Sequence, residues 1–303
     1  MKKRQIPFNN KELRKALLKE ENIPLVERLL QEEHQKLLEI RRYQETAPNP
    51  KRFSKEDFGN LQEGIKTQVN NLVGYSPEKD CTIIYGGSLT DKIATKYAAA
   101  ATAVGGIATT AIATGASLKA VAIFLGLETM GLAFYKAIGG FKEPNVYKAR
   151  LRRVKIAREE KEKVIPNLAH EYTHHILCTK GYTQKESALQ EGFCRGIERQ
   201  IAEDYAEKEN NPFFMEGPTE KTLSSLKVGY KLLCNRLKKK PNESLLKNIN
   251  HGRSFKDKIL DYFRKIDPNA MHYNLGNTLF MVTEEKQGRG FYKDIIDNKF
   301  AFN

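Results

Sequence analysis

The chain has 303 residues, which is long enough for two domains or for one domain with an insertion. Its formal net charge of +14 suits nucleic acid, an acidic membrane face or simply a solvated surface. Trp is absent and the aromatic residues are not interleaved with the basic runs, which argues against nucleic acid as a partner. Four widely spaced cysteines without a CxxC pair argue against a disulfide framework and indicate a reducing compartment.

Charged amphipathic helices are predicted at the start of the chain. Leucines recur at helical spacing over residues 11–46. Pro24 divides this stretch into two helices, and a proline suits the first turn of the second one. Another helix is expected after Ser54, followed by a short strand over residues 81–85. An extended peptide substrate could pair with the edge of this strand.

The composition changes sharply in the second quarter of the chain. No charged residue occurs over residues 97–118, and only two occur over residues 120–140. A helical membrane crossing needs about 20 mainly apolar residues, so residues 93–141 have room for a transmembrane helical hairpin in contact with lipid. The alternative is a buried, Ala-rich helical pair inside a soluble protein, because Ala, Thr and Gly insert poorly as single spans.

A basic segment follows the apolar one. Residues 142–163 contain nine Lys and Arg against four acidic residues. Basic flanks mark the cytoplasmic side of a membrane and can rest on anionic lipid, so the rest of the chain is expected in the cytoplasm. The alternatives are a solvated helix face for this segment and a soluble cytoplasmic location for the whole protein.

The sequence VIPNLAHEYTHHIL carries the strongest chemical motif. Pro166 suits the first turn of a helix, and no helix breaker follows until Gly181. His170 and His174 lie four residues apart, so both imidazoles project from one helical face and can hold one metal ion. Glu171 lies beside them, where it can reach a metal-bound water and act as the general base of an HExxH motif. The alternative is a pair of surface histidines that merely share a face.

A catalytic zinc site needs three protein ligands and an open position. The next predicted helix offers three carboxylates, Glu186, Glu191 and Glu198. We assign Glu186 to a capping box with Thr183, whereas a solvated helix face suits Glu198. Glu191 is the preferred third ligand, because it lies about two turns into the helix and Gly192 beside it permits a close approach of helices.

The segment HEYTH, sixteen further residues and the Glu-Gly pair of ESALQEGF resemble the gluzincin branch of the zincin metallopeptidases. The resemblance implies a zinc ion (Zn2+) held by His170, His174 and Glu191, with Glu171 as the general base.

A second segment, HYNLGNTLF, resembles the Y-x-x-G helix that ends many gluzincin catalytic domains. It implies that Tyr273, or else His272, stabilises the oxyanion of the reaction. The resemblance covers roughly residues 160–298. It departs from the usual pattern at Cys194 and Arg195, where smaller apolar residues are common.

The expected fold is mainly α (α+β), with a zincin-like catalytic domain that contains a small sheet. The expected regions are a charged helical N-terminal region (1–75), a short strand region (76–92), an apolar helical hairpin (93–141) and the catalytic domain (142–303). The expected function is hydrolysis of a peptide or protein substrate by Glu-assisted attack of a zinc-bound water, in a membrane-associated enzyme with a cytoplasmic active site. The alternatives are a catalytically inactive zinc-holding binding module and a membrane scaffold protein.

Overall fold

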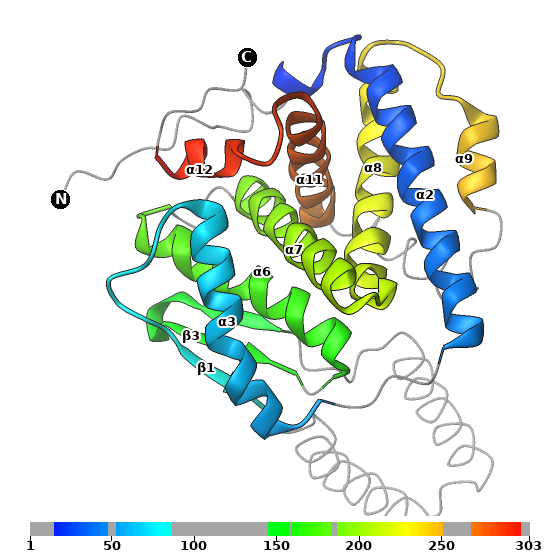
Figure 1. Ribbon diagram of the computed structural model, residues 1–303. Coiled ribbons are helices and arrows are strands. Elements are labelled where there is room, and N and C mark those ends of the chain that lie inside the picture. Colours follow the sequence, from blue (N-terminus) through cyan, green and yellow to red (C-terminus); the bar gives the residue numbers. More distant parts are fainter. Residues whose placement is uncertain are drawn as a thin grey trace, which may run out of the picture.

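The described residues form a mainly helical fold with a small sheet, as the sequence predicted, and this described sheet has three strands. The structure, a computed structural model, describes residues 15–47, 53–86, 145–157, 159–182, 187–250 and 268–297 (Figure 1). The elements in chain order are α2 (Asn22–Thr46), α3 (Lys55–Val73), β1 (Thr82–Tyr85), β2 (Val146–Lys148), η1 (Ala149–Leu151), β3 (Arg153–Ile156), α6 (Lys161–Thr179), α7 (Ser187–Glu209), η3 (Pro212–Met215), α8 (Glu216–Arg236), α9 (Glu243–Asn250), α11 (Pro268–Gln287) and α12 (Phe291–Ile296).

Helices α2 and α3 begin where the sequence predicted, whereas the start of the helix predicted ahead of Pro24 lies outside the described residues. Pro24 lies in the first turn of α2. Helix α3 begins after Ser54, whose side chain accepts a hydrogen bond from the backbone N–H of Asp57, and ends at the left-handed Gly74. Helix α2 packs against α8 and α3 packs against α6, so both helices contribute to one hydrophobic core.

Among the described residues the strand order of the sheet is β1-β3-β2, so β1 and β2 are the edges of the described sheet. Strand β1 pairs with β3 in parallel, and β2 pairs with β3 antiparallel. The described part of the basic segment forms β2, η1, β3 and the start of α6, so the alternative of a solvated helix face is wrong. Val154 and Ile156 of β3 are buried whereas Arg153 is exposed, because alternate residues of a strand face opposite sides.

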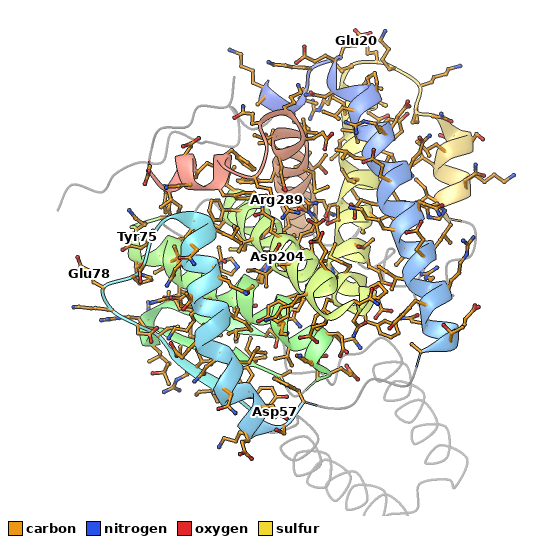
Figure 2. The ribbon with its side chains drawn as sticks, in the orientation of Figure 1. Glu20, Asp57, Tyr75, Glu78, Asp204 and Arg289 are labelled. Atoms are coloured by element: carbon orange, nitrogen blue, oxygen red, sulfur yellow. The ribbon has the colours of Figure 1, made fainter. Side chains whose placement is uncertain are left out.

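Helices α7 and α11 cross very closely beside α6 (Figure 1). A Cβ atom at Gly192 of α7 would lie 2.7 Å from the backbone carbonyl of Gly276 in α11. The sequence predicted a close approach at Gly192, but α11 and not α6 is the helix that approaches there. Further along, Arg289 pairs with Asp204 of α7 at 3.5 Å (Figure 2).

The apolar hairpin predicted over residues 93–141 lies outside the described residues. Within the described part of the chain, no helix has both the length and the apolar character that a membrane crossing requires. Membrane insertion therefore stays a prediction from the sequence.

Candidate metal centre

Helix α6 carries the HExxH motif. The sequence predicted that Pro166 lies in the first turn of this helix. The helix instead begins earlier, at Lys161, so Pro166 lies inside it. A proline inside a helix loses one backbone hydrogen bond. Here Val164 and Ile165 are fully buried, and packing of the additional turn against the core offsets that loss. The chain turns after the helix at Gly181, which has a φ of 90°.

The side chains of His170, His174 and Glu191 converge between α6 and α7. Nε2 of His170 lies 3.4 Å from one carboxylate oxygen of Glu191, and Nε2 of His174 lies 3.4 Å from the other. The potential ligand atoms of the three residues lie within 4.8 Å of one another. The structure thus brings together the three residues that the sequence proposed as metal ligands.

A cavity of about 610 Å³ opens at this group. Glu171, His174, Glu191 and Tyr273 all line it. Tyr273 reaches the cavity because it lies one turn before Gly276, at the close crossing of α7 and α11. No partner for the Tyr273 hydroxyl is found among the described side chains. The side chain of His272 lies outside the described part of the structure.

Strand β2 forms one wall of the same cavity through Val146 and Tyr147. The sequence instead offered the strand at residues 81–85 as the edge for a peptide. That strand, β1, is the other edge of the described sheet, and none of its residues is among those that line the cavity. The edge beside the candidate centre belongs to β2, which lies in the basic segment at 142–163, where the sequence predicted no strand.

Glu198 is buried behind His170, so its prediction as a solvated residue is wrong. Nδ1 of His170 lies 3.0 Å from one Glu198 oxygen, and Nζ of Lys221 in α8 donates to the other at 2.5 Å. A proton held on Nδ1 by a carboxylate leaves Nε2 of a neutral imidazole free to bind a metal. Glu198 follows Glu191 by seven residues, which is about two helical turns. This spacing places both carboxylates on one face of α7, and it is the signal in the sequence that could have identified Glu198.

Charge interactions within the centre shift three pKa values. Burial by itself would lower the pKa of His170, but Glu191 and Glu198 raise it to about 9. Burial raises the pKa of Glu191, but the two histidines outweigh it and hold this pKa well below its usual range. Burial also opposes ionisation of Glu198, yet Lys221 and His170 lower its pKa to about 2. Without a metal, the protonated His170 ring supplies the positive charge between the two carboxylates, and a bound cation would replace the proton on Nε2.

Comparison of the whole chain with protein-family models, curated proteins and solved structures gives no match. The function is therefore inferred from the residues of the centre and from their geometry. The most informative features are the identity of the three converging side chains and the cavity beside them.

Cys194 and Arg195, at which the sequence departs from the gluzincin pattern, lie beside the centre without displacing any of its three converging side chains. Cys194 is fully buried in the core. Nε of Arg195, one turn after Glu191, lies 3.9 Å from the Glu191 carboxylate. Neither residue belongs to the group of converging donor atoms, so the donor set of two imidazoles and one carboxylate is intact.

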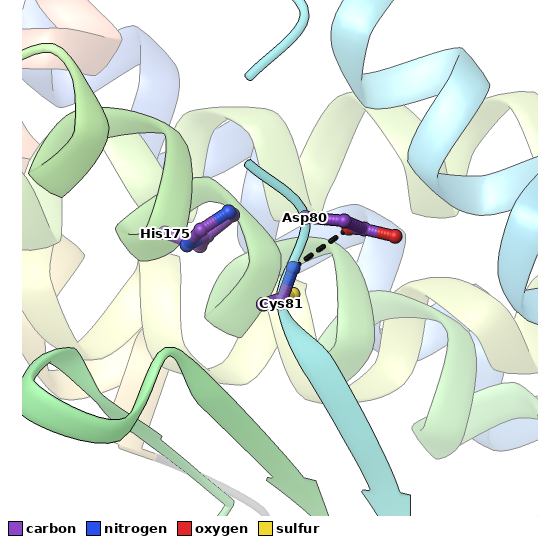
Figure 3. Close-up of side chains that lie close together, drawn as sticks. All are labelled: Asp80, Cys81 and His175. Atoms are coloured by element: carbon purple, nitrogen blue, oxygen red, sulfur yellow. Dashed lines mark hydrogen bonds between the residues drawn. The ribbon is translucent and has the colours of Figure 1, made fainter. Parts of the chain in front are cut away.

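A second group of potential ligands consists of Asp80, Cys81 and His175 (Figure 3). Both nitrogens of His175 already have partners, the carbonyl oxygen of Lys79 and the hydroxyl of Tyr147. Burial raises the pKa of the Cys81 thiol to about 12, which disfavours the thiolate that a metal needs. This group therefore serves packing and hydrogen bonding, and it is a poor metal site.

Proposed function

We propose that this protein is a zinc-dependent metallopeptidase that hydrolyses peptide bonds in a peptide or protein substrate. The observation that carries the proposal is the convergence of His170, His174 and Glu191 at a cavity that Glu171 also lines. Two imidazoles and one carboxylate form a donor set of catalytic zinc sites, which keep a further position open. The donor set therefore fits zinc, and the resemblance to gluzincins supports the same assignment.

The residues of the chain divide the chemical work between them. Zinc, when bound, lowers the pKa of water to about 7 and polarises a carbonyl group. Glu171, with 8% of its surface exposed, lines the cavity and is the proposed general base that takes a proton from the attacking water and passes it to the leaving amine. Glu198 orients the His170 ring through the hydrogen bond to Nδ1.

Strand β2 is the proposed docking edge for the substrate backbone. In the described sheet it pairs with β3 on one side, and Val146 and Tyr147 line the cavity. Unpaired backbone groups of an edge strand can accept a further strand. An extended peptide bound there would pass beside Glu171 and the converging histidines.

The function is tested on the full-length protein by zinc analysis and hydrolysis of a diverse peptide library. About one zinc per chain, with hydrolysis that a chelator abolishes and added zinc restores, would support the proposal. Stoichiometric zinc without hydrolysis would support a zinc-holding binding module. Zinc at far below one per chain would support a membrane scaffold in which the motif is accidental.

Membrane association with a cytoplasmic catalytic domain is part of the proposal and rests on the sequence alone. The apolar stretch at 93–141 and the basic residues that follow it are its support. Extraction tests it. A protein that leaves the membrane fraction without detergent and stays in solution would contradict the hairpin.

Tyr273→Phe is expected to lower kcat by about 10²–10³-fold, because the hydroxyl is the proposed donor to the oxyanion. KM should change by less than about threefold, since a group that acts in the transition state contributes little to ground-state binding. Steady-state kinetics and zinc content are the measurements. Tyr205→Phe, a buried tyrosine of α7 that does not line the cavity, is the matched control. An unchanged kcat would redirect the role to His272, which His272→Ala then tests.

A further inference from the structure

Tyr147 and His175 connect the cavity wall to the catalytic helix. The Tyr147 hydroxyl lies 3.1 Å from Nδ1 of His175, and the two rings meet edge to face with centroids 5.5 Å apart. Nε2 of the same imidazole lies 2.9 Å from the carbonyl oxygen of Lys79. Figure 3 shows His175 on α6, facing the segment that contains Asp80 and Cys81. Three segments that are distant in sequence are thereby joined at one buried ring.

The chemistry of these partners fixes the direction of both hydrogen bonds. A carbonyl oxygen only accepts hydrogen bonds. Nε2 of His175 therefore carries a proton and donates a hydrogen bond to the carbonyl oxygen of Lys79. In the neutral imidazole Nδ1 is then an acceptor, and the Tyr147 hydroxyl donates to it. The His175 ring is fully buried, whereas Tyr147 is half-buried on the cavity wall, so both hydrogen bonds are partly shielded from water.

The position of the pair relates it to the candidate centre. Tyr147 lines the cavity, and His175 directly follows His174 on α6. Strand β2 is three residues long and lies at the edge of the described sheet. So short an edge strand has few hydrogen bonds of its own and is prone to local opening. The hydrogen bond from Tyr147 to the buried His175 ring of α6 limits that opening.

We propose that Tyr147 and His175 are positioning residues that hold β2 at the spacing from α6 at which an extended peptide can bind. The proposal rests on the proposed peptidase function. Neither hydrogen bond of the pair involves the converging ligands or Glu171. Loss of the Tyr147–His175 hydrogen bond therefore changes the ground-state binding of the peptide more than the chemical step.

Tyr147→Phe removes one hydroxyl group and keeps the ring. It is expected to raise KM by about 5–10-fold, the size of one lost hydrogen bond, with kcat within about twofold. Zinc content should be unchanged. His175→Leu should raise KM similarly, whereas His175→Asn places an oxygen near the Nδ1 position and should restore part of the loss. In the double variant Tyr147→Phe with His175→Leu the two effects should not add.

Hydrogen exchange tests the connection without any hydrolysis, so its failure is distinguishable from failure of the peptidase proposal. Backbone amides of residues 146–156 should exchange at least about fivefold faster in Tyr147→Phe than in wild type, because local opening becomes easier. Amides of α7 should be unaffected, and Tyr205→Phe should match wild type throughout. Unchanged exchange in β2, or a fall in kcat or in zinc content in place of a higher KM, would overturn the proposal. If the His175 variants do not fold, Tyr147→Phe carries the test.

Discussion

Glu171→Gln is expected to abolish peptide hydrolysis while zinc stays bound. Glutamine has nearly the same shape as glutamate but cannot accept the proton of the attacking water, and loss of a general base costs about 10²–10⁴-fold in kcat. Glu171 does not belong to the group of converging donor atoms formed by His170, His174 and Glu191. The measurement is kcat together with zinc per chain for the variant and wild type.

The matched control is Glu162→Gln, a half-buried glutamate in the first turn of the same helix. It makes the same chemical change on α6 away from the cavity, so kcat should stay within about twofold of wild type. Full hydrolysis by Glu171→Gln would move the base to another residue. A variant that loses both zinc and activity would instead make Glu171 a ligand or a structural residue.

The convergence of His170, His174 and Glu191 could be predicted from the sequence because its geometry is mostly local. A spacing of four residues on one helix determines that His170 and His174 share a face. Glu191 needed one further assumption, that the next helix folds back beside the first, and Gly181 provides that turn. The structure brings Glu191 to both imidazoles, although the close packing at Gly192 is directed at α11.

The features that could not be predicted depend on contacts between distant segments. Glu198 is buried because Lys221 from α8 neutralises it, and no local pattern identifies that partner. Strands β2 and β3 form within a basic segment because β3 pairs with β1, which lies about 70 residues earlier in the chain. The Tyr147–His175 bond likewise requires the register of that sheet against α6.

Glu191→Ala is expected to remove zinc from the purified protein. Only two imidazoles then remain of the three converging donors, and two ligands hold zinc far more weakly than three. We expect the affinity for zinc to fall by more than about 100-fold. Loss of a residue that only hydrogen-bonds to a ligand costs up to about 100-fold, and loss of the ligand itself should cost more. Competition with a zinc-binding dye and direct metal analysis measure the effect. Glu207→Ala, an exposed residue on the same helix, should bind zinc like wild type.

Glu198→Gln supplies the graded comparison. The amide keeps an acceptor for Nδ1 of His170 but loses the charge that pairs with Lys221, so zinc affinity should fall by about 10–100-fold. The expected order of affinity is wild type, then Glu198→Gln, then Glu191→Ala. The reverse order of the two variants would make Glu198 the ligand and Glu191 its support. Wild-type zinc affinity in Glu191→Ala would contradict the proposed centre. It would show that the Glu191 carboxylate, although 3.4 Å from both imidazoles, does not bind the metal.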